Sequence, residues 1–134
     1  MENQELQQKY MEFQLLGEQM KQTQKQIQVL EEQMTEIVYT QQSLDSIKDL
    51  KKGDQILVPV SNGIFAEATI TNTEKLIVNV GANTMVQKSV ESAKEMLSQQ
   101  VTEVSNLHIQ LHEMLGKIEE ELQGLQRELS KSGE

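Results

Sequence analysis

Hydrophobic and polar positions divide the chain into three zones with different periodicities. In residues 1–50 and 89–134, apolar side chains recur three and four positions apart, which places them on one face of an α-helix. In residues 53–88, apolar positions alternate with polar ones, as in short β-strands, and this zone contains the only proline. The pattern therefore predicts a helix, a group of strands and a second helix.

The first helical zone has an imperfect apolar seam. It is predicted to run through Leu6, Tyr10, Phe13, Gly17, Met20, Gln24, Ile27, Leu30, Met34, Ile37, Gln41 and Leu44. Gln24 and Gln41 are polar exceptions. Two successive steps of three, from Gln24 to Ile27 to Leu30, predict a stammer, which locally overwinds a heptad coiled coil.

The second helical zone is more regular, and its only polar seam position is His108. Its seam runs through Val101, Val104, His108, Leu111, Leu115, Ile118, Leu122, Leu125 and Leu129. An unbroken repeat with Gln, Glu and Lys between the apolar positions is typical of a coiled coil. Ser89 is the expected N-cap of this helix.

The two helical zones have similar lengths, about 70 Å each at ~1.5 Å per residue. Matched helices on either side of a short connector favour an antiparallel pair within one chain, with Leu50 opposite Val90. Two separate intermolecular coils are the alternative. The intramolecular pair is favoured because closing a short connector costs less entropy.

The middle zone predicts two β-hairpins. The first has strands at 56–60 and 64–70 around Asn62-Gly63, a pair typical of a two-residue turn in which both residues have positive φ. The second has strands at 76–80 and 84–88 around Gly81-Ala82-Asn83. Two uncovered hairpins expose strand edges and an apolar face, so we expect other subunits to cover them. The predicted oligomerisation residues are Ile56, Val58, Val60, Ile64, Phe65, Ile70, Leu76, Val78, Val80 and Val86.

Composition narrows the functional classes. Hydrophobic residues make up 37%, which favours an elongated shape with a narrow apolar seam. The net charge is −9 and Arg127 is the only arginine, so binding to nucleic acid or to an anionic membrane is disfavoured. Cysteine is absent, which excludes disulfides and thiolate metal sites. No signal peptide or membrane-spanning run is evident, and we expect a cytoplasmic protein.

Candidate chemistry is sparse. His108 and His112 are four residues apart and could share one helical face, but a metal site needs a third ligand that the sequence does not indicate. No Gly-rich phosphate loop is present, and no Ser or Thr can be paired with a histidine as a nucleophile. The sequence therefore predicts no catalytic residue, no cofactor, no metal site and no enzymatic activity.

Three segments carry a resemblance to a known family. They are Ile56–Phe65 with its Leu-Val-Pro-Val-Ser-Asn-Gly run, Lys75–Gly81, and Val86–Ala93 with its Lys-Ser-Val-Glu run. With the order helix, two hairpins, helix, they resemble the alpha class of prefoldin subunits. Asn83 and Met85 depart from the family pattern, which has glycine and an aromatic residue there.

The resemblance implies an α+β fold over residues 1–134 as a single domain, with helices at 1–50 and 89–134 and hairpins at 53–88. It implies an ATP-independent chaperone of two alpha and four beta subunits, whose hairpins form a β-barrel platform. The coil ends would hold non-native polypeptides and deliver them to a group II chaperonin. The alternative is a structural coiled-coil tether or assembly scaffold without client binding.

The predicted client-binding residues lie near the two ends of the chain. They are Leu6, Tyr10, Met11, Phe13, Leu16, Leu122, Leu125 and Leu129. Gly17 and Gly124 are expected at similar levels of the helix pair, and each weakens a helix by about 1 kcal/mol relative to alanine. One interpretation is that the two glycines loosen the coiled coil so that it can open around a client. The other is that they are tolerated without a function, and the sequence favours neither interpretation.

Overall fold

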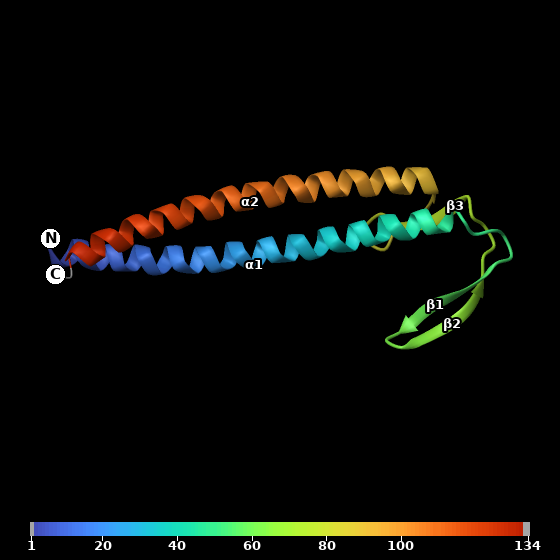
Figure 1. Ribbon diagram of the computed structural model, residues 1–134, viewed down its shortest axis with the longest axis horizontal. Helices are drawn as coiled ribbons and strands as arrows, with labels where there is room; N and C mark the ends of the chain where they lie inside the picture. Colours follow the sequence, from blue (N-terminus) through green and yellow to red (C-terminus); the bar gives the residue numbers. More distant parts are fainter. Residues whose placement is uncertain (1, 133–134) are drawn as a thin grey trace. The chain divides into compact units, whose positions relative to one another are not determined.

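The computed structural model describes residues 2–132 as two long helices separated by two β-hairpins (Figure 1). In chain order, the elements are α1 (Asn3–Ile47), β1 (Gln55–Ser61), β2 (Ile64–Thr69), β3 (Lys75–Asn79), β4 (Met85–Ser89) and α2 (Val90–Ser132). The predicted α+β fold class is confirmed.

The described residues form two units. The helical unit combines α1 up to Met34 with α2 from Glu103, and the hairpin unit is Thr35–Thr102. No helix within residues 2–132 has a stretch that is long and apolar enough to cross a membrane.

Polar contacts between the helices show that they run antiparallel within one chain. They are an ion pair of Lys9 with Glu128 and a hydrogen bond of Glu31 with His108 in the helical unit, and an ion pair of Asp45 with Lys94 in the hairpin unit. As the α1 partner advances along the chain, the α2 partner recedes. This confirms the predicted intramolecular pair, and the register agrees with the predicted one to within a helical turn.

The seam of α1 differs from the prediction in its first half. Lys9, Leu16 and Thr23 are buried or half-buried there, whereas Tyr10 is 51% exposed and Gln24 is exposed. The observed steps alternate between three and four from Leu6 to Leu44, so the predicted stammer is absent. The prediction was wrong because Lys and Thr are polar types, yet a lysine stem and a threonine methyl can cover apolar surface.

The seam of α2 is confirmed, since all nine predicted positions are buried or half-buried. The predicted N-cap is confirmed as well. The Ser89 hydroxyl accepts a 3.0 Å hydrogen bond from the Ser92 backbone N–H, which satisfies one of the free donors at the start of a helix.

Strands β1 and β2 form an antiparallel hairpin with an irregular turn. Pro59 pairs with Phe65 and Ser61 with Ile64, so Val60 is an extra residue in β1. Gly63 has a φ of +78°, but Asn62 does not have a positive φ. The predicted turn with two positive φ values is therefore wrong. The extra residue gives a bulged hairpin, in which one left-handed residue is enough.

Strands β3 and β4 form the second hairpin, with Asn79 paired to Met85. Its turn confirms the predicted Gly81-Ala82-Asn83 segment, in which φ is +120°, +49° and +59°. The Asn79 side chain accepts a 2.9 Å hydrogen bond from the Gly81 N–H, which holds the chain in this left-handed path.

The core of the hairpin unit joins one hairpin to both helices. Leu44, Ala93 and Leu97 are buried together, and Leu76 and Val78 from β3 pack against them. Burial of one such large aliphatic side chain contributes about 1.5–3 kcal/mol. No side chain within residues 2–132 is wholly enclosed, so the stability of a single chain rests on many partly buried positions.

The corrected seam is testable with two neighbouring substitutions that add the same charge. Thr23→Glu places a carboxylate at a position that is 5% exposed and should lower stability by about 1–3 kcal/mol. Gln24→Glu lies on the exposed face and should change stability by less than about 0.5 kcal/mol. Urea unfolding followed by circular dichroism measures both. Equal losses of stability, or a larger loss for Gln24→Glu, would show that Gln24 lies in the contact between the helices.

Candidate functional site

The two hairpins carry an apolar surface, here called the hairpin surface. It consists of the exposed side chains of Leu57, Val58, Val60, Ile64, Phe65, Ile77, Val80 and Met85. On β1, the adjacent residues Leu57 and Val58 are 65% and 40% exposed, and neighbours along a strand point to opposite faces. The β1–β2 hairpin is thus apolar and exposed on both faces.

Strand edges add hydrogen-bonding capacity to this surface. Within residues 2–132, the strands form two sheets of two strands each, β1 with β2 and β3 with β4. Each strand therefore pairs along one side only and presents an unpaired row of N–H and C=O groups along the other. Free edges beside exposed apolar faces are suited to pairing with another chain.

The predicted oligomerisation residues fall into three groups. Val58, Val60, Ile64, Phe65 and Val80 are exposed on the hairpin surface. Ile56, Ile70 and Val86 are half-buried. Leu76 and Val78 are also half-buried, and they pack against the core of their own chain.

Sequence reasoning missed Leu57, Ile77 and Met85, which are 65%, 71% and 63% exposed. On β1, β3 and β4 it assigned one apolar face, and these residues lie on the other face. The available signal was the run Ile56-Leu57-Val58, because consecutive apolar residues in a strand indicate that both faces are to be covered.

A second apolar surface lies near the beginning of α1. Tyr10, Met11 and Leu15, here called the terminal coil surface, are 51%, 70% and 57% exposed. Met11 and Leu15 are four residues apart and therefore neighbours on one helical face. Leu15 was missed by the prediction, although this spacing from Met11 could have indicated it.

The other predicted client-binding residues are half-buried in the seam between α1 and α2. They are Leu6, Phe13, Leu16, Leu122, Leu125 and Leu129. Leu16, which was assigned to a position off the seam, is a seam residue. Of the predicted set, only Tyr10 and Met11 are exposed at the surface.

A groove of about 430 Å³ adjoins the terminal coil surface. It is lined by Glu12, Leu15, Leu16, Glu121, Gly124, Leu125 and Glu128. A Cβ atom added at Gly124 would meet nothing within 4 Å, so the missing side chain helps to keep the groove open. Apolar side chains of the seam can therefore be reached from solvent at this level.

An ion pair in the hairpin unit has a structural role beside the buried core. The pKa of Asp45 is lowered because Lys94 donates a hydrogen bond to its carboxylate and places a positive charge nearby. The same hydrogen bond raises the pKa of Lys94. Both side chains lie at the surface, so the pair orients the helices and contributes little stability.

Comparison with known proteins agrees with this architecture. The model of the prefoldin subunit family matches residues 16–134. The prefoldin subunit alpha of Thermofilum pendens is 34% identical over 96 residues, which are 72% of this chain and 74% of the relative. That of Archaeoglobus fulgidus is 24% identical over 126 residues, 94% of this chain and 92% of the relative.

A solved structure shares the fold. The cryo-EM structure of filamentous PFD from Methanocaldococcus jannaschii superposes with a TM-score of 0.78 at 20% identity, covering 87% of this chain and 96% of that chain. Antiparallel helices joined through two hairpins with free edges define the fold of a coiled-coil assembly subunit. The chain belongs to the prefoldin family, as an alpha-type subunit. Subunits of this family are chaperone components without enzymatic activity, which confirms the prediction that the chain is not an enzyme.

The Asp45–Lys94 pair predicts a pH dependence of stability. A lowered pKa in the folded state gives stability that is present above the unfolded value near 3.8 and lost as pH falls through the folded pKa. Asp45→Asn should therefore lower the thermal midpoint at neutral pH, and the difference from wild type should vanish at about pH 2. Asp49→Asn is the matched control. If the thermal midpoint of Asp45→Asn stays equally far below that of wild type at the acidic pH, the loss of stability comes from packing and not from the ion pair.

Proposed function

We propose that this chain is the alpha-type subunit of a hetero-oligomer of two alpha and four beta subunits, in which the hairpins of all subunits form a β-barrel platform. The hairpin surface supports the proposal. The β1–β2 hairpin is exposed on both faces, and every described strand has one free edge. A two-stranded hairpin in water is marginally stable, so pairing with beta-type subunits supplies the missing strands and cover.

Non-native polypeptides bind at the terminal coil surface without nucleotide. The single observation that supports this best is the exposure of Tyr10, Met11 and Leu15 beside the open groove at Gly124. Unfolded chains expose scattered apolar groups, and their burial contributes about 25 cal/mol per Å² without a fixed geometry. Several coils contacting one client add avidity, although each contact is weak.

The held polypeptide passes to a group II chaperonin, as the family resemblance implies. Weak multivalent holding supports such a transfer because each contact can be released singly while the others persist. No step requires nucleotide, since the bound state is stabilised by apolar burial alone.

A structural scaffold without clients is the second candidate. The free strand edges favour it, because they could pair with further copies of the same chain. The similar solved structure is described as filamentous, which shows that its fold is compatible with extended assembly in that protein. Client holding separates the two functions, since a scaffold has no use for an exposed terminal coil surface.

Assembly should depend on the hairpin surface. Val58→Lys combined with Ile64→Lys places charges in the proposed barrel contact, and burying an unpaired charge is strongly unfavourable. We expect the double variant to remain largely helical but to fail to join beta-type subunits. Mass measurement by light scattering and helicity by circular dichroism test this.

The matched control is Val38→Lys combined with Tyr39→Lys, two exposed positions on α1 that are 43% and 71% exposed. This control should assemble normally. Intact oligomers in the hairpin variant would place the interface elsewhere, and failure of both variants would show that added charge alone prevents assembly.

Client holding should depend on the terminal coil surface. Tyr10→Ser, Met11→Ser and Leu15→Ser together remove exposed apolar area without touching the seam, so the subunit number should not change. The triple variant, assembled with its partner subunits, should lose most of its suppression of aggregation of a denatured test protein without nucleotide. Light scattering during refolding of the test protein measures this loss.

Val29→Ser, Val38→Ser and Tyr39→Ser together form the control, because they remove exposed apolar side chains elsewhere on α1. They should retain holding activity. Full activity in the Tyr10, Met11 and Leu15 variant, with an unchanged mass, would refute the proposed client site and favour the scaffold.

A further inference from the structure

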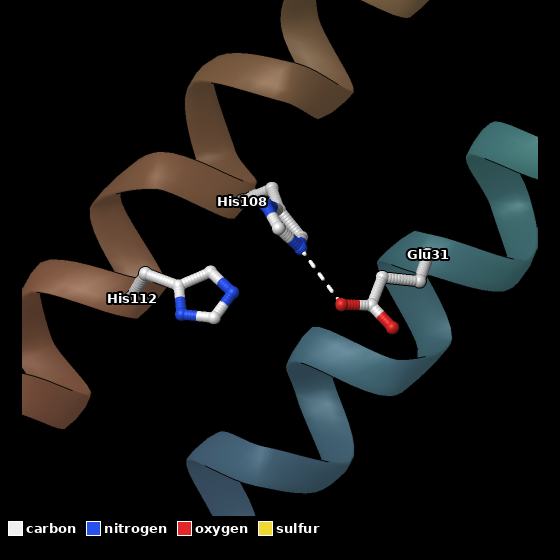
Figure 2. A group of neighbouring side chains, drawn as sticks. All are labelled: Glu31, His108 and His112. Carbon is white, nitrogen blue, oxygen red and sulfur yellow. Dashed lines mark hydrogen bonds and ion pairs between the residues drawn. The ribbon is translucent and has the colours of Figure 1, made fainter.

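Three metal-ligating side chains from the two helices converge in the helical unit. Figure 2 shows His108 and His112 of α2 turned toward Glu31 of α1. One ligating atom of each residue lies within 4.8 Å of those of the other two. The Nε2 atom of His108 is 3.1 Å from Oε1 of Glu31.

The spacing already approaches that of a metal centre. Two ligands bound to one tetrahedral Zn²⁺ at ~2.0–2.1 Å are about 3.3 Å apart, close to the distance between His108 and Glu31. The imidazoles of His108 and His112 lie edge to face, with ring centroids 4.5 Å apart. Both rings are thus near enough to reach one ion after small side-chain rotations.

The exposure of the three side chains determines which of them can rotate. His108 occupies a seam position and its side chain is only 23% exposed, so packing fixes its ring. Glu31 already contacts the His108 ring at 3.1 Å, and His112 is exposed on the same face of α2. Two of the three ligands are therefore already in contact, and only the exposed His112 ring has to turn for an ion to complete the site on the folded helix pair.

We propose that Glu31, His108 and His112 bind Zn²⁺, with water as the fourth ligand. Two imidazole nitrogens and one carboxylate oxygen suit Zn²⁺, whereas Mg²⁺ and Ca²⁺ require sets of oxygen ligands. An exposed fourth position is the natural place for water. The net charge of −9 also favours a bound cation.

The bound ion joins α1 to α2. Because its ligands come from residues 77 positions apart, the site exists only when the helices are paired in the observed register. Zinc therefore stabilises the paired state and not the unfolded chain. His108 is the one polar residue among the nine predicted seam positions of α2, and a role as ligand accounts for its placement.

The competing explanation is a self-contained pair, in which the hydrogen bond between His108 and Glu31 is the whole function of the cluster. The two explanations differ at His112. A metal site requires this exposed residue, whereas the pair of His108 and Glu31 does not.

The test uses the full chain after removal of bound metal with a chelator. Titration with Zn²⁺ should give one ion per chain and raise the thermal midpoint by several degrees, and EDTA should reverse the rise. The chain has two histidines, so nitrogen NMR of the imidazoles reports on both ligands directly. Both rings should shift on zinc binding. Co²⁺ used as a probe should give the visible absorption of a four-coordinate site.

Variants separate the outcomes. His112→Gln and Glu31→Gln should each weaken zinc binding by at least ~10-fold, with helicity unchanged. Glu113→Gln, a neighbouring exposed carboxylate outside the cluster, is the control and should bind as wild type. Unaltered affinity in His112→Gln, one ion per two chains, or a shift of neither imidazole would overturn the proposal.

Discussion

The packing of α1 against α2 along a seam of alternating three- and four-residue steps determines the rest of the structure. It sets the antiparallel register, and that register brings Lys94 to Asp45 and His108 to Glu31. In the hairpin unit, the same packing creates the buried group of Leu44, Ala93 and Leu97, on which β3 rests. A sheet of two strands has no core of its own, so β3 and β4 depend on the helices for a covering layer.

Within residues 2–132, several large apolar side chains remain exposed. The β1–β2 hairpin exposes Leu57 and Phe65, and α1 exposes Met11 and Leu15. These two exposures have different consequences. A hairpin offers strand edges with directional hydrogen bonds, which favour a defined assembly, whereas a helix has no free backbone groups along its length and offers only adaptable apolar contact. The division between an assembly surface and a client surface follows from this difference.

The sequence predicted those features that depend on residue type and local spacing. From Val101 to Leu129 the α2 seam was predicted correctly, because every position except His108 is an aliphatic residue. The prediction did not extend to Ala93 and Leu97, which are buried nearer the start of α2. The α1 seam was not, because Lys9 and Thr23 occupy seam positions through the apolar parts of polar side chains. The turn at Asn62 was predicted from the Asn62-Gly63 pair alone. The extra residue Val60 depends on how β1 pairs with β2, and the Asn-Gly pair carries no information on that pairing. The contact between Glu31 and His108 follows from the helix register and not from the spacing of the two histidines, which was the only signal used for a metal site.

Direct localisation of a bound client tests the central claim, that polypeptides are held on the terminal coil surface. A photoreactive amino acid would replace Leu15 in one preparation and Tyr39 in another, each assembled with beta-type subunits. Both positions are exposed on α1, at 57% and 71%, so their accessibility is comparable. We expect an unfolded protein to be cross-linked from position 15 and not from position 39. Equal cross-linking from both positions, or cross-linking from position 39 alone, would contradict it.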